Sequence, residues 1–309
     1  MRRPVSAEVT DCVPDGEGSR LVSQSLVEHQ GRLQAAIAKL RAARPGDVHD
    51  ARVAARRLRA LLTTYRPLFD ERKAQRLRRG LRDFASGLSG PRDADVRRDL
   101  LLAVAARVLR LAVADTRCLR AALRRDCAES RLAMRELLGK EDWAESAGIL
   151  GDRRTLAVLR LRPDVELAEL LELVDQPWRD AGKRLAASPG SPTELHRLRL
   201  ILKRCRYALE SVSSLQPVRA GRVIDRLQSV QDSLGEYLDA VAARKWLKGN
   251  EAMLGRRLVR RLDDELQALE KKLKALTRRR LAGLVPAYVK WGMALRGLRT
   301  PEEATRDPA

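Results

Sequence analysis

Aromatic residues, histidines and paired cysteines are scarce in this chain of 309 residues. Only 3% of the residues are Phe, Trp or Tyr, and there are three histidines. None of the four cysteines belongs to a C-x-x-C pair, and no Cys/His cluster has the spacing of zinc ligands. We therefore expect no metal site and no cofactor. Unpaired, reduced cysteines are typical of a cytoplasmic protein, which is the localisation that we predict.

Long apolar runs and strand-like segments are also missing. The longest apolar run, LLLAVAA at 100–106, is too short to cross a bilayer. The first 20 residues contain two arginines but lack the apolar stretch of a signal peptide. No segment of convincing length alternates like a β-branched strand. The abundance of Leu, Ala and Arg instead predicts an all-α protein.

Positive charge is what the chain has in excess. The formal net charge is +21 and the isoelectric point is about 10.8. An excess of this size indicates the kind of partner rather than the fold. Nucleic acid, an anionic membrane surface and another polyanion are the candidates, and a generally basic proteome is the simplest alternative.

Helical periodicity and capping residues divide the chain into two series of helices. Segment 1–22 contains Pro, Gly and acids, and segment 299–309 contains Pro and acids, so we expect both to be disordered. Residues 140–162 are less regular and are interpreted as the joint between two halves. Ser191 and Glu194 form an S-x-x-E capping box with Pro192 at the first helical position. Helices are predicted over about 23–43, 47–66, 70–88 and from 93 onward, then over about 164–187, 191–213, 217–234, 237–248, 251–281 and 285–298.

Two stretches far apart in the chain are nearly the same. VHDARVAARRLRALL (48–62) returns as LHRLRLILKRCRYAL (195–209) at a constant offset of 147. Downstream, LSGPRDADV (88–96) aligns with LGEYLDAVA (234–242) at an offset of 146. We interpret this as an internal duplication of a roughly four-helix unit, with repeats over about 23–150 and 160–298.

Each repeated stretch places its cations on one stripe of a helix. At about 100° per residue, the first stripe holds His49, Arg52, Arg56 and Arg59, with Arg57 on the flank. The second stripe holds His196, Arg199, Lys203 and Arg206, with Arg204 on the flank and Tyr207 inside the stripe as a candidate hydrogen-bond donor. The opposite faces are apolar, and Cys205 lies among them as a small core residue.

A merely solvated helix face is the simplest alternative for these stripes. Solvated faces usually mix charge signs, whereas neither 51–69 nor 195–209 contains an acid. Like charges at i,i+3 and i,i+4 cost about 0.2–0.5 kcal/mol per pair, and the costly pattern occurs twice. An anion between the cations would relieve the repulsion. His49 and His196 either belong to this site or merely pack at the helix starts, and His29 has no counterpart and is interpreted as incidental.

The pattern H-x-x-R-x-x-x-[RK]-R-x-R resembles the CHAD family, the conserved histidine α-helical domain. It is present as HDARVAARRLR and HRLRLILKRCR, and RDADV at 92–96 is also similar to that family. The resemblance covers about residues 23–298. It implies two related four-helix bundles around a pseudo-twofold axis, with a central basic groove or channel. Members bind inorganic polyphosphate, and some associate with polyphosphate granules. The implied binding residues are His49, Arg52, Arg56, Arg57, Arg59, His196, Arg199, Lys203, Arg204 and Arg206, to which Tyr207 is added from its place on the stripe.

Three functions remain in competition. The first is non-catalytic binding of polyphosphate or a similar polyanion, with no membrane partner. The second is non-specific nucleic-acid binding, which net charge permits but the shortage of aromatics disfavours. The third is a polyphosphate kinase or phosphatase, but the sequence has no P-loop and too few acids near the motif for a two-metal centre. We assign no catalytic residue. The two histidines either face each other across one groove or serve two separate sites.

Overall fold

The computed structural model describes residues 16–40, 45–108, 111–152 and 154–296. Within these ranges the regular elements are all helical, which confirms the predicted all-α class. The first half contains α1 (Glu17–Lys39), α2 (Pro45–Thr64), α3 (Glu71–Gly87), α4 (Gly90–Arg107), α5 (Val113–Leu138), α6 (Glu141–Gly151) and α7 (Arg154–Ala157). The second half contains α8 (Leu167–Ala186), α9 (Pro192–Ser211), α10 (Pro217–Gly249), α11 (Glu251–Leu254) and α12 (Arg256–Arg296).

Several predicted boundaries are corrected by the structure. Helix α1 begins at Glu17, inside the segment expected to be disordered, whereas residues 1–15 and 299–309 lie outside the described residues. The joint at 140–162 contains α6 and α7. Helix α10 runs without a break through 235–236, and α12 likewise passes 282–284. The helix predicted over 251–281 is instead interrupted at Gly255, between α11 and α12, where the backbone φ of 84° favours glycine.

The capping box predicted at the start of α9 is present. The Glu194 backbone N–H donates to the Ser191 hydroxyl at 3.3 Å, and the Ser191 N–H donates to the Glu194 carboxylate at 2.9 Å. The hydrogen bonds that the Glu194 carboxylate accepts from the Ser191 N–H, the Ser191 hydroxyl and the Gly190 N–H lower the pKa of Glu194 to about 2. The bounds of α9 lie 147 positions after those of α2, and a short 3-10 helix follows each, at Arg66–Leu68 and Ser213–Leu215. The duplication itself stays a prediction.

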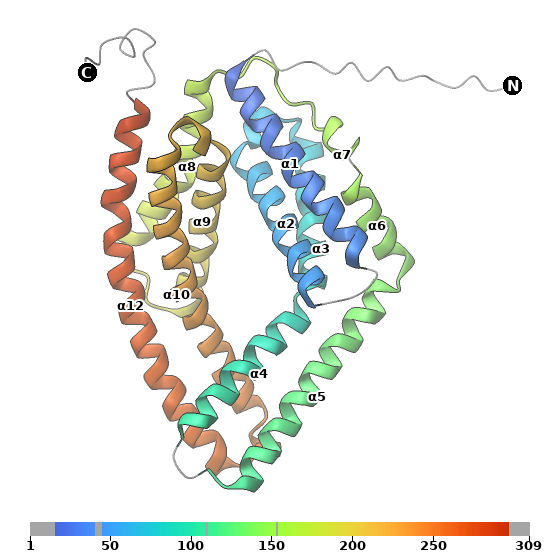
Figure 1. Cartoon of the computed structure of the whole chain (residues 1–309), viewed down its shortest axis with the longest axis vertical. Helices are drawn as coiled ribbons and strands as arrows, with labels where there is room; N and C mark the ends of the chain where they lie inside the picture. Colours follow the sequence, from blue (N-terminus) through green and yellow to red (C-terminus); the bar gives the residue numbers. More distant parts are fainter. Residues whose placement is uncertain (1–15, 41–44, 109–110, 153, 297–309) are drawn as a thin grey trace, which may run out of the picture.

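Helices α2 and α9 lie side by side at the centre of the molecule (Figure 1). Helices α1 and α3 pack on α2, and α8 and α10 pack on α9. Two long arms extend from this upper part: α4 with α5, and the second half of α10 with α12. The arms converge where α11 contacts α5. The packing therefore brings the two predicted basic helices against each other.

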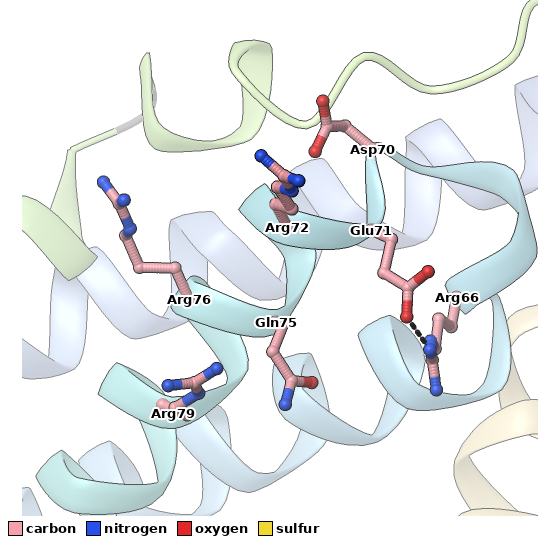
Figure 2. Close-up of a pocket in the computed structure, with 7 residues that line it drawn as sticks. All are labelled: Arg66, Asp70, Glu71, Arg72, Gln75, Arg76 and Arg79. Carbon is pink, nitrogen blue, oxygen red and sulfur yellow. Dashed lines mark ion pairs between the residues drawn. The ribbon is translucent and has the colours of Figure 1, made fainter.

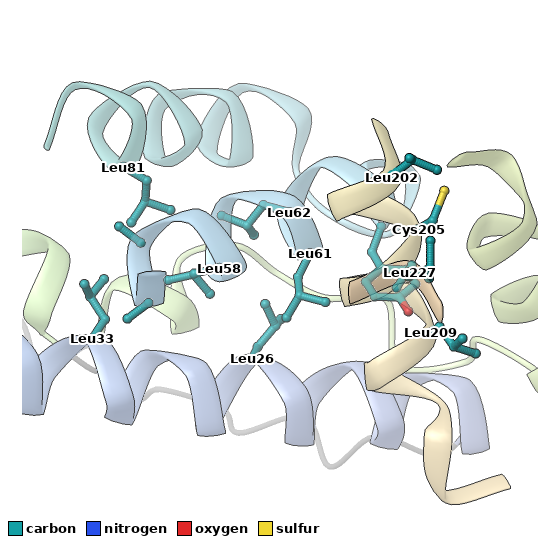
Figure 3. Packing of buried hydrophobic residues seen from close by; sticks show 14 of the residues in the cluster. Leu26, Leu33, Leu58, Leu61, Leu62, Leu81, Leu202, Cys205, Leu209 and Leu227 are labelled. Carbon is teal, nitrogen blue, oxygen red and sulfur yellow. The ribbon is translucent and has the colours of Figure 1, made fainter. Parts of the chain in front are cut away.

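The apolar faces of α2 and α9 belong to one continuous core (Figure 3). Leu58 and Leu61 of α2 and Leu202 and Leu209 of α9 are fully buried, and so is Cys205, as predicted. The Tyr65 and Ser211 hydroxyls lie 2.5 Å apart across the two helix ends. A separate apolar cluster holds the arms together. With the apolar sides of both helices in the core, their basic stripes lie on the opposite sides.

Candidate anion-binding site

Each helix presents its cations opposite the core. His49 and His196 are exposed. The remaining stripe residues are half-buried, namely Arg52, Arg56, Arg59, Arg199, Lys203 and Arg206. A long side chain at this depth buries its methylene stem and keeps its charged end toward solvent. The predicted division of each helix into an apolar side and a cationic side therefore agrees with the observed burial.

Lys203 is the point where the two stripes meet. Burial, which has the largest effect, and the neighbouring Arg199, Arg56, Arg206 and Arg52 together lower the pKa of its ammonium to about 7. Two of these arginines belong to α2 and two to α9. We call Arg52, Arg56, Arg199 and Lys203 the central cluster. Tertiary packing thus gathers cations from both predicted repeats into one place.

Two arginines of the central cluster are anchored in matching ways. Arg52 donates from Nη1 to the carbonyl of Ser89 at 3.4 Å, and Arg199 donates from Nε to the carbonyl of Gln231 at 3.3 Å. Gly235 makes room for the second contact, because a Cβ there would lie 2.9 Å from Nη2 of Arg199. This close approach explains a glycine inside the continuous helix α10, where glycine costs about 1 kcal/mol relative to alanine.

Acids compensate the central cluster only in part. The Asp93 carboxylate lies 3.7 Å from the Arg52 guanidinium and is itself mostly exposed. Burial raises the pKa of Asp239 while Arg199 opposes that rise. Asp93 and Asp239 are the pair that aligns at the offset of 146, so each half supplies one arginine and one nearby acid. Asp232 also acts on Arg199. The four cations of the central cluster thus face three carboxylates, and a positive excess remains.

The two histidines lie beside the cations of their own half. Burial lowers the pKa of His49, and Arg92, Arg56 and Arg52 add to that effect. Burial, Arg199 and Lys203 lower the pKa of His196. Both imidazoles are therefore neutral at pH 7 and can each donate one hydrogen bond. Because Ser191 supplies the cap of α9 and His196 is exposed, a packing or capping role does not account for His196.

Ion pairs and cation–π contacts among four residues link α2 to α9. Arg57 lies 3.0 Å and Arg206 3.5 Å from opposite oxygens of Glu210. The ring of Tyr207 lies 5.2 Å from the Arg57 guanidinium and 5.1 Å from that of Arg206. We call Arg57, Arg206, Tyr207 and Glu210 the clasp. Arg57 therefore has an internal ion-pair partner in Glu210.

Tyr207 differs from its predicted place. Its side chain is only 3% exposed, and its hydroxyl accepts a hydrogen bond from Arg206 Nη2 at 3.4 Å. The helical wheel put it inside the basic stripe, but the approach of α2 covers the ring. Glu210 was not singled out from the sequence, although it stands four residues after Arg206 on the same helix, at the spacing of an i,i+4 ion pair.

Arg59 and Arg204 have different neighbours from those of the central cluster. Burial lowers the pKa of Arg59, with Arg82 and Arg56 as the nearest cations. The Arg204 guanidinium lies 3.8 Å from Asp180 of α8, while its Nε is buried without a hydrogen-bond partner. The structure thus divides the predicted residues into a central cluster, a clasp, two flanking histidines and these two outlying arginines.

Two searches of the described residues returned nothing. No group of three or more His, Cys, Asp or Glu side chains in this part of the chain could hold a metal ion. No helix within the described ranges is long and apolar enough to cross a membrane.

Comparisons with known proteins agree on the fold. A family model described as the CHAD domain matches residues 24–248. A crystal structure of the CHAD domain from the plant Ricinus communis has a TM-score of 0.69 and 21% identity, covering 92% of this chain and 97% of that one. PptA from Streptomyces chartreusis has a TM-score of 0.67 and 20% identity, covering 87% and 98%. No curated protein matches the sequence.

Proposed function

The chain belongs to the CHAD domain family, and on that premise we propose that it binds inorganic polyphosphate without catalysis. The ligand would lie in a groove between α2 and α9, against the central cluster. The family supplies the class of ligand, and the charges of α2 and α9 supply the site. Association with polyphosphate granules would follow from the same binding.

The environment of Lys203 is the observation that carries the proposal. A half-buried ammonium beside four arginines is unfavourable in the free protein, because like charges repel and burial removes water. The arginine side chains keep their protons at neutral pH, so the repulsion among them persists. A chain of phosphates would place a negative charge beside each cation and remove that cost. The positions of these residues thus favour an elongated polyanion over a single small anion.

The chemistry of the side chains fits phosphate oxygens. Each guanidinium of Arg52, Arg56 and Arg199 can donate two parallel hydrogen bonds to a phosphate, whereas Lys203 acts as a point charge. Neutral His49 and His196 would each donate one hydrogen bond to an oxygen at the edge of the site. Binding should release counterions and weaken steeply with salt, as it does for other polyelectrolytes.

Paired charge reversal tests the proposal. Arg52→Glu with Arg199→Glu should lower affinity for long-chain polyphosphate about 100-fold or more, because it places two acids where the phosphates would bind. Affinity is measured by titration at fixed salt, and helicity by circular dichroism. Arg52→Gln with Arg199→Gln is the milder variant, and it should still lower affinity if the reversal disturbs folding.

Two matched measurements can contradict the proposal. Arg278→Glu with Arg279→Glu reverses two exposed charges on α12 and should change affinity much less. Equal losses in both double variants would indicate diffuse attraction instead of a site. Double-stranded DNA that outcompetes polyphosphate at equal salt would favour nucleic-acid binding, and release of phosphate by the pure protein with Mg²⁺ would refute the non-catalytic assignment.

A further inference from the structure

Helix α3 carries a second group of cations that the proposed function does not use. Residues 72–82 contain six cations and no acid. A depression of about 820 Å³ lies over this helix and the preceding turn (Figure 2). Its lining residues are Arg66, Asp70, Glu71, Arg72, Gln75, Arg76 and Arg79. The depression is outside both repeated stretches, so the duplicated motif does not account for it.

The charge balance of this depression is positive. Glu71 forms an ion pair with Arg66, and Asp70 accepts the Lys73 backbone N–H at 3.0 Å as the cap of α3. Arg72, Arg76 and Arg79 are exposed and follow one another at i, i+4 and i+7. Figure 2 shows these three guanidiniums projecting from one side of the helix. The acids nearest to them along α3, Glu71 and Asp83, pair with Arg66 and Arg82. We call Arg72, Arg76 and Arg79 the α3 stripe.

A line of cations connects the α3 stripe to the central cluster. Arg59 lies on α2 one turn after Arg56, and Arg56 and Arg82 both lower its pKa after burial. Arg78 on α3 is half-buried, and its pKa is lowered by burial and by Arg66, Arg204 and Arg59. Arg78 then donates from Nη1 to Gln75 at 3.4 Å, and Gln75 lines the depression.

The angles around α3 make this connection continuous. Taking the buried Ala74 as zero, about 100° per residue places Arg78 near 40°, Arg82 near 80° and Gln75 near 100°. The α3 stripe then spans about 140° to 200°. The cations therefore spread from the side of α3 that faces α2 to its outer side. Two acids of α3 fall in this sector: Glu71, near 60°, pairs with Arg66, and Asp83, near 180°, pairs with Arg82 at 2.9 Å.

We infer that the α3 stripe is a second binding surface for the same polyphosphate chain, which leaves the central cluster past Arg59 and Arg78 and continues over α3. This inference rests on the proposed function. The connecting residues include no aromatic side chain, so nothing along α3 offers a stacking surface to nucleotide bases. A bare phosphate chain needs only a row of guanidiniums, and α3 provides that row.

A chain-length comparison tests the inference. Arg72→Gln with Arg76→Gln and Arg79→Gln should lower affinity for long-chain polyphosphate about tenfold and reduce the salt slope by about two to three. The same variant should bind tripolyphosphate as the unaltered protein does, because a short chain is held by the central cluster alone. The three side chains are exposed, so the variant should keep its helicity.

A triple variant on α5 is the matched control. Arg117→Gln with Arg120→Gln and Arg124→Gln removes three exposed charges spaced i, i+3 and i+7 and should change affinity for long chains less than twofold. Equal losses in the two triple variants, or equal loss for tripolyphosphate and long chains, would overturn the inference. So would a loss confined to DNA. An α3 variant with unchanged affinity for long chains refutes the second surface alone, whereas an unaltered protein that binds no polyphosphate refutes the proposed function as well.

Discussion

In the arms the half-buried arginines lie against carboxylates, whereas in the central cluster they lie against one another. Arg244 lies 2.7 Å from Asp263 and 3.1 Å from Glu270, and hydrogen bonds to these acids raise its pKa. Burial instead lowers the pKa of Arg199, although Asp239 opposes that fall. The arms therefore use arginine to hold helices together. The central cluster keeps a positive charge that the protein itself does not neutralise.

Arg97 gives a second example from the arms. Its Nη2 donates to Asp126 at 2.6 Å, and its guanidinium lies 5.6 Å from the ring centre of Trp246, whose indole N–H donates to the same carboxylate at 3.3 Å. Here α4, α5 and α10 meet around one acid. The comparison teaches that net charge and arginine content do not identify a binding site, and that the partners of each arginine do.

The largest effect is expected from placing an acid in the central cluster. Lys203→Glu would add a carboxylate between the arginines of the cluster and so make it resemble the arms. Affinity for polyphosphate should fall about 100-fold, and the free energy of unfolding should stay the same or rise because repulsion is relieved. Titration and urea denaturation measure the two quantities. A variant that is strongly destabilised but still binds would contradict the proposed contrast.

The reverse manipulation in the arms should affect stability instead. Arg244→Met would leave Asp263 and Glu270 close together without their main partner, at a cost of about 2 kcal/mol in the free energy of unfolding. Affinity for polyphosphate should stay within twofold of the unaltered protein. Arg56→Met is the matched change in the central cluster, and it should lower affinity without lowering stability. Similar losses of stability in both variants would remove the distinction between the two regions.

A smaller effect is expected from pH, because Lys203 of the central cluster titrates near neutrality. The pKa of Lys203 is about 7 without ligand, and bound phosphates would raise it. Binding then takes up a proton above pH 7, so affinity is full below pH 7 and falls by at most about tenfold per pH unit above it. Titrations at pH 6.5, 7.5 and 8.5 measure the slope.

Arginine at position 203 supplies the control for this slope. Lys203→Arg keeps the charge at all these pH values, so its affinity should not depend on pH across the range. The pKa values of His49 and His196 are lowered from 6.5, so in the free protein both are mostly neutral at pH 7.5 and 8.5. An equal slope in the variant and the unaltered protein would assign the dependence to another group.

Local rules were enough to predict the elements around the site. The repeat placed α2 and α9 at the same offset as their observed bounds, and the Ser191 capping box fixed the start of α9. Burial of Leu58 and Leu202 opposite the cations follows from helical periodicity. These features depend on residues within a few positions of one another, so one sequence suffices to predict them.

The same rules failed where a residue distant in the sequence decides the outcome. Gly235 suggested a helix break, but the glycine lies in the continuous α10 because Arg199 needs the space. The helical-wheel angle of Tyr207 predicted a place in the basic stripe, yet its ring is buried against α2. The cations of α3 were not singled out from the sequence, because their series does not recur in the second half. Only the folded structure brings Arg78 of α3 close enough to Arg59 of α2 for Arg59 to lower its pKa.

The sequence by itself determined an all-helical chain with two basic amphipathic helices, because periodicity and capping act over a few residues. It also determined that each of these helices has an uncompensated stripe. Only the tertiary structure decided which cations stay uncompensated. Glu210 and Asp180 reach Arg57 and Arg204 and pair with them, whereas the central cluster gains cations from the opposite helix. Electrostatic interactions act through space rather than along the chain, so the packing of α2 on α9 separates the clasp from the central cluster.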